Sequence, residues 1–412
     1  MKVLQVNNVD LHGRRFNGYD LLEDLRTRDV QGKQAVLSKL STDSEVIGLL
    51  GDAGDQELQH RIESAEHRHS MNGLLFPWGR LLAETQEFQD ADVVHYHLIH
   101  NQMISLLDLP WLFGLKPTVW TLHDPWLLTG HCVHPMACER WLCGCRDCPS
   151  LDAHFRLETD CADRMWRIKQ RVLSETDPDI VVASSYMLDM VRRSPITCGV
   201  GRVHLIPFGV EPESFPDDAA KPANRARLGI PENDFVVMLR ADTIGFKGLQ
   251  YISEALGQRN PDRPTTLVTV RQRHLLDDLA GAYNIVDLGW LDDPSLLRRV
   301  YSACDVFLMP STAESFGLMA LEAMAAGRPV ICFEGKALVE LTHAPECGIA
   351  VPMRDSSALR AAVDHLALHP EEAERRGRLG RTIAAEHYGQ ERYLDALASL
   401  YREVATRSRH GL

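Results

Sequence analysis

The sequence lacks the features of membrane-spanning and secreted chains. No stretch approaches the roughly 18 consecutive apolar residues that a membrane span needs, so we expect no integral membrane segment. The opening residues, MKVLQVNNVDL, reach the polar Asn7, Asn8 and Asp10 too early to form the apolar core of a signal peptide. We therefore expect a cytoplasmic protein with at most peripheral membrane association.

Positive charge is also scarce. The 412 residues include 44 Lys and Arg against 57 Asp and Glu, which gives a formal net charge of −13. An acidic chain of this kind gives no support to a nucleic-acid-binding role. The hydrophobic content of 45% and the charged content of 25% are those of ordinary soluble globular proteins. The length suits two domains of roughly 200 residues each.

Short runs rich in β-branched residues alternate with amphipathic segments that we expect to be helices, such as YDLLEDLRTR and SYMLDMVRR, the second of which follows DIVVASS. This alternation predicts mostly parallel sheets covered by helices. The pattern restarts after RVHLIPFGVEPESFP, which is typical of a linker. We predict an α/β fold with two Rossmann-like βαβ domains that face each other across a cleft. The expected divisions are an N-terminal domain over 1–205, a C-terminal domain over 206–385, and a helix over 386–412 that is a candidate to cross back to the first domain.

Two glutamates lie eight positions apart in STAESFGLMALEAMAAGRP, residues 311–329. A strand, CDVFLMP, precedes this loop, and Gly317 would allow a tight turn where the next helix begins. The free backbone N–H groups of residues 316–318 would then form an anion site. Glu322, one turn into the helix, could accept hydrogen bonds from the ribose diol of a bound nucleotide, and Glu314 could reach sugar hydroxyls. The alternative is a Glu314 that caps the helix and a solvated Glu322.

A pair of cations occurs in FVVMLRADTIGFKGL. Arg240 ends a predicted strand and Lys247 lies where the next helix opens, between Gly245 and Gly248. Ligands of open parallel sheets bind beyond the carboxyl ends of the strands, so both side chains would face the cleft. Fixed cations at this place could stabilise a leaving diphosphate as its charge grows. An exposed surface pair is the alternative.

These motifs resemble the retaining glycosyltransferases of family 4, which have the GT-B fold. ESFGLMALE over 314–322 matches their E-x7-E signature, and IPFGVEPESF over 206–215 resembles their interdomain segment. The resemblance covers nearly the whole chain and is strongest over 300–352. It implies that Glu314 contacts the donor sugar, that Glu322 contacts the ribose, and that two cations contact the diphosphate. The implied donor-binding residues are Gly18, Arg240, Lys247, Glu314, Ser315, Phe316, Gly317, Leu318 and Glu322.

Candidate residues in the first domain follow its strands. WTLHDPW places His123 and Asp124 at a strand end, and the resemblance implies a histidine there that approaches the donor sugar, with Asp124 as its orienting partner. His95 and His97 share one face of a strand, where they could line the acceptor pocket or simply pack. Related enzymes usually have paired glycines in the first loop, whereas LHGRRFNGYDL separates them. The implied catalytic residues are His123, Asp124, Arg240, Lys247 and Glu314.

A cysteine-rich insert, HCVHPMACERWLCGCRDCPSL, occupies residues 131–151. Cys132, Cys138, Cys145 and Cys148 have the spacing C-x5-C-x6-C-x2-C, and four thiolates could close a tetrahedral structural zinc site. The alternatives are reduced thiols that pack, two disulfides, or an iron–sulfur cluster. Four protein ligands would leave no open position for chemistry at the metal.

These observations predict a retaining, hexosyltransferase-type enzyme. It would move a sugar from a nucleoside-diphosphate sugar to a hydroxyl of a glycan, lipid-linked or small-molecule acceptor, as in polysaccharide biosynthesis. We expect no catalytic metal, because the D-x-D at Asp177-Pro-Asp179 is typical of a surface turn. The rival hypotheses are a nucleotide-sugar epimerase of the same fold and an inactive nucleotide-sugar-binding protein.

Overall fold

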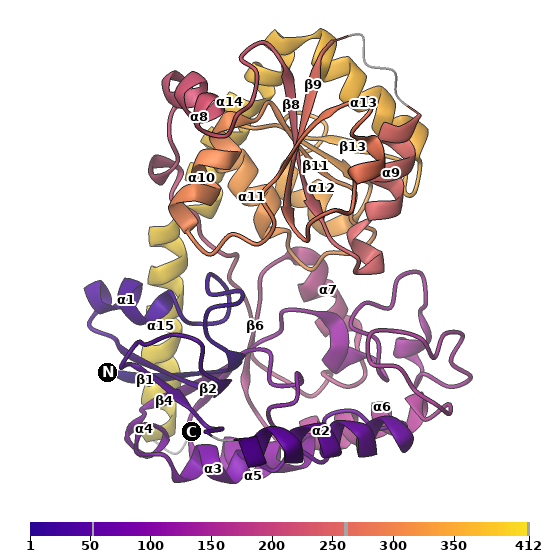
Figure 1. Cartoon of the computed structure of the whole chain (residues 1–412). Coiled ribbons are helices and arrows are strands. Elements are labelled where there is room, and N and C mark those ends of the chain that lie inside the picture. Colours follow the sequence, from indigo (N-terminus) through magenta and orange to yellow (C-terminus); the bar gives the residue numbers. More distant parts are fainter. Residues whose placement is uncertain (52, 259–262, 410–412) are drawn as a thin grey trace. The chain divides into compact units, whose positions relative to one another are not determined.

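A computed structural model describes residues 1–51, 53–258 and 263–409. The chain forms two compact units: Met1–Pro207 with Tyr393–Leu412, hereafter the N-terminal unit, and Phe208–Arg392, the C-terminal unit. Each unit is an α/β domain built on one parallel sheet, in agreement with the predicted fold class (Figure 1). The units divide after residues 207 and 392, whereas the sequence led us to expect divisions after 205 and 385.

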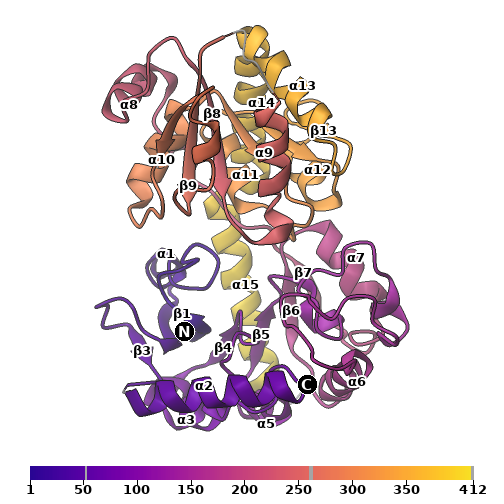
Figure 2. The ribbon, with the colours of Figure 1, turned by 45° about the vertical axis from the view of Figure 1, so that its right-hand side comes forward.

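The N-terminal unit contains a seven-stranded sheet in the order β3-β2-β1-β4-β5-β6-β7. Its strands are β1 (Lys2–Val9), β2 (Gln31–Ser38), β3 (Val46–Gly48), β4 (Val93–Tyr96), β5 (Thr118–Thr121), β6 (Asp179–Val182) and β7 (Val203–Leu205). Its helices are α1 (Leu21–Asp24), α2 (Ala53–Arg68), α3 (Trp78–Glu84), α4 (Gln86–Asp90), α5 (Leu109–Leu115), α6 (Ala162–Ser174), α7 (Ser185–Arg193) and, from Tyr393 on, the C-terminal α15 (Gln390–Arg409). Figure 2 shows α2, α3 and α5 gathered along one side of this unit.

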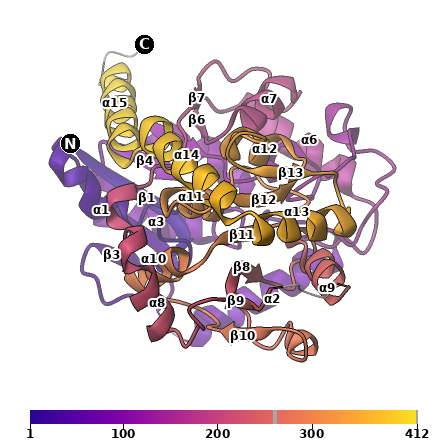
Figure 3. The same cartoon turned by 90° about the horizontal axis from the view of Figure 1, so that it is seen from above.

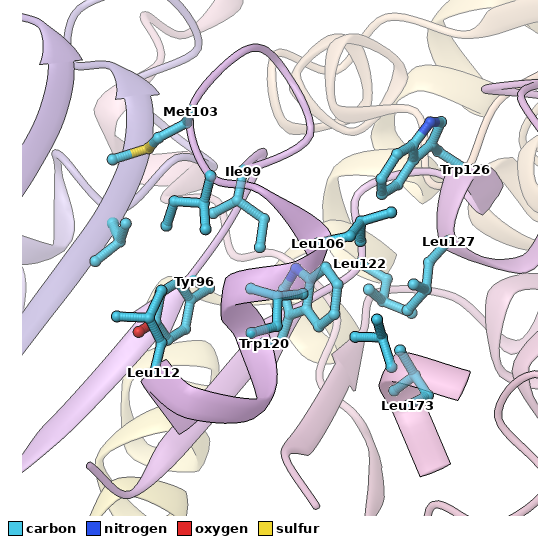
Figure 4. Close-up of a cluster of buried hydrophobic side chains, with 14 of the residues drawn as sticks. Tyr96, Ile99, Met103, Leu106, Leu112, Trp120, Leu122, Trp126, Leu127 and Leu173 are labelled. Atoms are coloured by element: carbon cyan, nitrogen blue, oxygen red, sulfur yellow. The ribbon is translucent and has the colours of Figure 1, made fainter. Parts of the chain in front are cut away.

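Both faces of this sheet are covered, which explains why its central strands are buried along their whole length. Tyr96 and Trp120 are partners in the register of β4 and β5, and they point into the hydrophobic cluster of Figure 4. Side chains alternate along a strand, so His95 points to the opposite face. Helix α15 covers that second face, where its Tyr401 contacts His95, and Figures 1 and 2 show it beside β1 and β4.

The C-terminal unit contains a six-stranded sheet in the order β10-β9-β8-β11-β12-β13. Its strands are β8 (Phe235–Ala241), β9 (Thr265–Arg271), β10 (Asn284–Asp287), β11 (Val306–Met309), β12 (Val330–Phe333) and β13 (Ile349–Val351). Its helices are α8 (Lys221–Arg227), α9 (Leu249–Gly257), α10 (Pro294–Ala303), α11 (Leu318–Ala325), α12 (Lys336–Thr342), α13 (Ser356–Leu368) and α14 (Pro370–Tyr388). Figure 3 shows α13 and α14 in succession along this unit.

Close packing of α14 depends on a glycine. A Cβ atom at Gly377 would lie 2.0 Å from the carbonyl oxygen of Gly327, just after α11, so a larger residue would push α14 away.

None of the described helices combines the length and the apolar character that crossing a bilayer requires.

Two local predictions need correction. The segment YDLLEDLRTR, expected as one amphipathic helix, forms only the short α1 and a 3-10 turn over Leu25–Arg28. Asp179 of the D-x-D was expected in a surface turn, but it is 2% exposed and begins β6. Its carboxylate accepts hydrogen bonds from Arg202, His204 and Arg407, and these partners make the burial of a charge tolerable.

Candidate functional site

The C-terminal unit brings two of the predicted residues into direct contact. Lys247 follows β8 and Glu314 follows β11, and these strands are hydrogen-bonded neighbours in the sheet. Nζ of Lys247 lies 2.7 Å from Oε1 of Glu314. The two side chains are only 15% and 12% exposed, so the pair is much less screened by solvent than a surface ion pair.

Backbone contacts hold the two loops together. The N–H of Thr312, after β11, donates to the carbonyl of Phe246, after β8, at 2.8 Å. Gly248 follows Lys247 with a φ of +82°, and a Cβ atom there would lie 1.9 Å from the carbonyl oxygen of Pro310. A glycine is therefore required at 248 both for its backbone conformation and for the close approach of the two loops.

Arg240 lies beside this pair and is held by a carboxylate. Its Nη2 and Nε atoms donate to Oδ2 of Asp242 at 2.5 and 3.0 Å, and Nε of Arg271 lies 3.4 Å from the same oxygen. Burial would raise the pKa of Asp242, but the N–H of Ile244 and the guanidinium groups of Arg240 and Arg271 hold it below its usual value. Arg240, Lys247 and Glu314 line one small pocket together with Ser311 and Met319.

The loop after β11 leads directly into α11. Gly317 is the N-cap residue, with a φ of +103°, and a Cβ atom there would lie 2.6 Å from Cδ2 of Leu338. Phe316 before it is buried, with its ring edge-on to those of Phe208 and Tyr388. The turn and the first backbone N–H groups of the helix are therefore fixed by local packing.

Glu322 lies within α11 but is not solvated. Glu322 is only 4% exposed, and its Oε2 accepts a hydrogen bond from the hydroxyl of Tyr301, on α10, at 3.0 Å. The alternative of a solvent-facing glutamate is therefore wrong. A neighbouring helix orients this carboxylate.

In the N-terminal unit, the predicted histidines meet at the ends of β4 and β5. Nδ1 of His97 is 3.0 Å from Nε2 of His123, and Nε2 of His97 is 2.8 Å from Oε1 of Gln5. His95 contacts the hydroxyls of Tyr401 and Thr121, each at 2.7 Å. His95 and His97 are 0% and 2% exposed, which agrees with the alternative that they pack in the interior.

Burial dominates the protonation of these three rings. Desolvation lowers the pKa of His95 and of His123 to about 3 and places the pKa of His97 well below its usual value, with smaller contributions from neighbouring imidazoles. All three histidines are therefore neutral near pH 7. In the hydrogen bond between His97 and His123, one neutral imidazole must therefore donate and the other must accept.

Asp124 was expected to orient His123. In the structure, its Oδ2 lies 3.3 Å from Nε2 of His100 and its Oδ1 accepts the N–H of Trp126. Burial would raise the pKa of this carboxyl, but His100 and the N–H of Trp126 hold it at about 2. The contact that reaches Nε2 of His123 comes from His97 instead.

Gly18 lies over this histidine chain. Its φ is +94°, and a Cβ atom there would lie 2.8 Å from Cβ of Gln5 and 2.9 Å from Nε2 of His97. Phe16, in the same loop, places its ring 5.3 Å from that of His123. The loop after β1 therefore closes onto the strand-end histidines.

Comparison with known proteins decides the family. Residues 234–369, which hold the Lys247–Glu314 pair, match the family "Glycosyl transferases group 1". A D-inositol 3-phosphate glycosyltransferase of Saccharomonospora viridis is 30% identical over 339 residues, which cover 78% of this chain and 72% of that protein. The chain belongs to the group 1 glycosyltransferases.

Further relatives of this glycosyltransferase agree. WcaC of Escherichia coli (strain K12), named as a colanic acid biosynthesis glycosyl transferase, is 26% identical over 264 residues, which cover 60% of this chain and 61% of that protein. The crystal structure of Anabaena Alr3699/HepE in complex with UDP and glucose superposes with a TM-score of 0.64 at 16% identity, covering 96% of this chain and 98% of that chain. The enzyme therefore has the GT-B type of fold, with two Rossmann-like domains.

The cysteine-rich insert of the glycosyltransferase holds free thiols at Cys132, Cys138, Cys145 and Cys148. Burial, and then the neighbouring thiols, raise the pKa of Cys132 to about 12. Nε2 of His131 is 3.4 Å from Sγ of Cys148. Within the described ranges, the only three or more His, Cys, Asp or Glu with ligand atoms mutually within 4.8 Å are His274, Asp277 and Asp287. The predicted zinc ligands are therefore neighbours without forming a closed coordination shell, and zinc stays a prediction.

Several residues of the glycosyltransferase site escaped the sequence analysis. Asp242 lies two residues after the predicted strand-end cation, and this position could have suggested a partner for Arg240. Gln5, Tyr301 and Tyr401 had no such signal, because each reaches its site only through the packing of an element distant in sequence.

Proposed function

We propose that this glycosyltransferase moves a sugar from a nucleoside-diphosphate sugar to a hydroxyl of a glycan, lipid-linked or small-molecule acceptor, with retention of the anomeric configuration. We place the reaction in the cytoplasm, with at most peripheral membrane contact, and in polysaccharide biosynthesis. The observation that carries the proposal is the Lys247–Glu314 contact beside Arg240 in one pocket.

That pocket offers the groups that such a donor needs. Lys247 and Arg240 present positive charge to a diphosphate, whose leaving group becomes more negative as the glycosidic bond breaks. Glu314 is positioned by Lys247 and would accept hydrogen bonds from sugar hydroxyls. Glu322, whose carboxylate is oriented by the hydroxyl of Tyr301, would bind the ribose diol.

The helix start supplies further donors. The backbone N–H groups at Phe316, Gly317 and Leu318 open α11, where the helix dipole favours an anion. Ser315 precedes them in the same loop. Complexes of the structural relative HepE with UDP and with UDP-glucose support a nucleotide-sugar donor for this chain.

In the proposed reaction, the leaving diphosphate is neutralised by Arg240 and Lys247 and accepts the proton of the attacking hydroxyl. A front-side attack of this kind needs no carboxylate nucleophile and no metal. His123 is half-buried and lies just after β5 in the N-terminal unit. There it would accept a hydrogen bond from a hydroxyl of the donor sugar.

The test is a donor and acceptor screen. Thermal shifts with UDP, GDP and ADP would first identify the base, and release of that nucleoside diphosphate would then be measured with each matching sugar nucleotide and a panel of hydroxyl acceptors. We expect release that depends on the acceptor, and NMR of the product should show the donor's anomeric configuration. An inverted product would overturn the retaining mechanism.

Controls separate the rival functions. Conversion of the sugar nucleotide to an epimer without any acceptor would instead establish an epimerase. Tight nucleotide binding with no turnover of any donor would establish an inactive binding protein. The Lys247→Ala variant measures how much nucleoside diphosphate is released without the proposed catalytic cation, and this value is the background of the assay.

A further inference from the structure

A cavity in the C-terminal unit lies at the edge of the sheet opposite to the predicted donor residues. Its volume is about 330 Å³, and it is lined by Phe235, the first residue of β8, and by Asp305, just before β11. Lys247 and Glu314 follow the other ends of the same two strands. The cavity is therefore separate from the small pocket that Arg240, Lys247 and Glu314 line.

Four basic side chains from three segments of the chain line this cavity. They are Lys221 and Arg225 of α8, Arg263 just before β9, and Arg328 after α11. Two of them share one carboxylate, because Nζ of Lys221 lies 2.5 Å from Oδ1 of Asp305 and Nη2 of Arg225 lies 2.7 Å from Oδ2. Asp305 can balance only one of these two cations, so positive charge remains in this part of the wall.

The fold uses the donors of these cations to different extents. Arg225 donates to three backbone carbonyls as well as to Asp305, so its guanidinium group is occupied by the fold. Nζ of Lys221 carries three protons, and its one hydrogen bond to a described residue is the one to Asp305. Arg263 donates to two backbone carbonyls, those of Asn233 and Ala367. Lys221 and Arg263 therefore keep donors for a ligand.

Arg328 is the most informative of the four cations, because it is only 5% exposed. Its Nε donates to the carbonyl of Ala326 at 2.9 Å, and its Nη2 pairs with Asp218. Nη1 forms no hydrogen bond within the ranges that the structure describes. A nearly buried charged donor without an acceptor is costly, and an anion in the cavity would supply that acceptor.

The chemistry of the wall favours a ligand with both a phosphoryl group and hydroxyl groups. Arg and Lys side chains bind phosphate oxygens well. A volume of about 330 Å³ is typical of small-molecule pockets and leaves room beyond a phosphate. Glu232, Asn233 and Glu374 are exposed residues of the same wall, and their oxygens can accept hydrogen bonds from hydroxyls. The charge of Glu374 is paired with Arg378 at 3.6 Å, which limits its repulsion of an anion.

We propose that this cavity binds a phosphorylated small molecule of the sugar phosphate class. Lys221, Arg263 and Arg328 hold its phosphoryl group, and Glu232 and Glu374 accept hydrogen bonds from its hydroxyls. Ligands of open parallel sheets usually bind beyond the carboxyl ends of the strands, whereas this site lies at the amino ends. It is therefore additional to the donor site, and its ligand is not a substrate of the transfer.

The test is calorimetric titration of the full-length protein with glucose 6-phosphate, at low ionic strength in a buffer free of phosphate. We expect one molecule to bind per chain, inorganic phosphate to bind more weakly, and glucose not to bind. Lys221→Gln and Arg263→Gln should each weaken the binding of glucose 6-phosphate at least fivefold. Arg375→Gln is the control, because Arg375 is an exposed residue of α14 that does not line the cavity, and its affinity should stay within twofold.

Further variants and a crystal soak locate the ligand. Lys247→Ala should bind glucose 6-phosphate as the wild type does, and a loss of binding there would place the ligand in the donor pocket and overturn the proposal. Failure of the wild type to bind glucose 6-phosphate, equal binding of glucose, or unchanged affinity in both Lys221→Gln and Arg263→Gln would also overturn it. If neither variant folds in urea-unfolding controls, a crystal soaked with glucose 6-phosphate decides, since phosphate density must lie against Arg328. None of these measurements requires transfer, so failure of the proposed function would leave their outcome unchanged.

Discussion

The ammonium nitrogen of Lys247 lies 2.7 Å from Oε1 of Glu314, although 67 residues separate them in the chain. Their loops follow neighbouring parallel strands, so the contact is a direct product of the sheet order. A carboxylate and a diphosphate compete for the same ammonium group. The pair therefore fixes Lys247 in place and keeps it available to a ligand with more negative charge.

Replacing Lys247 with Ala should slow transfer about 100-fold, since a fixed cation that stabilises a leaving group is worth a few kcal/mol in the transition state. The affinity for the donor should fall much less. Steady-state release of nucleoside diphosphate measures both. Lys33→Ala is the control, because Lys33 forms an exposed ion pair with Glu87 at 3.2 Å and should leave kcat unchanged. Wild-type kcat in Lys247→Ala would remove the residue from the mechanism.

Replacing Glu322 with Ala should weaken nucleoside-diphosphate binding at least tenfold and lower the free energy of unfolding by about 1–3 kcal/mol, because the buried Tyr301 hydroxyl loses its acceptor. Calorimetric titration and urea unfolding would measure the two effects. Glu66 is equally buried, at 4% exposure, and accepts three backbone N–H groups in the N-terminal unit. Glu66→Ala should destabilise the protein without changing nucleotide affinity. Equal affinities in all three proteins would show that Glu322 is only structural.

Two glycines that flank Lys247 provide a matched pair. Gly248→Ala should cost about 1–2 kcal/mol for the left-handed backbone alone and more for the collision with Pro310, and it should also reduce transfer by displacing Lys247. Gly245→Ala, for which no heavy atom lies within 4 Å of the added Cβ, should stay within about 0.5 kcal/mol of the wild type. Urea unfolding and kcat, measured on both variants, check this. Equal stability of the two variants would contradict the described loop geometry.

Acid should destabilise the N-terminal unit through its buried histidines. Their folded-state pKa values lie below the ordinary 6.5, so below pH 6.5 the unfolded chain binds protons that the folded chain does not. Stability is therefore highest above pH 6.5 and falls as the pH approaches 3, with a slope of about 1.4 kcal/mol per pH unit for each fully buried ring. Urea unfolding followed by tryptophan fluorescence at pH 7.5, 6.5 and 5.5 measures the slope.

Histidine variants identify the source of this pH dependence. His97→Gln should reduce the slope by the share of one ring, whereas His60→Gln, at a side chain that is 77% exposed, should leave it unchanged. Identical slopes in the wild type and His97→Gln would exclude a contribution from His97.

Elemental analysis tests the predicted structural zinc. Protein purified without chelator should contain one zinc per chain, and Cys145→Ser or Cys148→Ser should lose it. Cys198→Ser is the control, because Cys198 is an exposed thiol of the same unit outside the insert. A chain without zinc would end the metal hypothesis. Adding a chelator should leave kcat for sugar transfer unchanged as long as the enzyme stays folded, because no metal takes part in the proposed reaction.

Strand-and-helix alternation predicted the two parallel sheets because buried parallel strands and amphipathic helices have different periods in the local sequence. The loop after β11 and the Arg240–Lys247 segment were found for the same reason, since each motif is contained in a few consecutive residues. Sheet order is not contained in any local pattern. The 2.7 Å contact of Lys247 with Glu314 therefore could not be predicted from the two motifs alone.

Contacts between residues of elements distant in the sequence also could not be predicted. Glu322 was expected to bind ribose, but its burial beside Tyr301 depends on how α10 packs on α11. Asp179 was expected in a surface turn. Its burial depends on Arg202, His204 and Arg407, which come from other segments of the chain and bind its carboxylate. In each case the decisive neighbour is fixed by tertiary packing, not by spacing along the chain.

The hydrogen bond between Gln5 and Tyr401 joins residues 396 positions apart, so it has a consequence for synthesis on the ribosome. Strand β1 emerges early, yet the polar face that it shares with β4 stays uncovered until α15 has been translated. Such long-range closure slows folding and leaves a nascent intermediate exposed to misassembly. The first domain to be made is thus among the last to be finished.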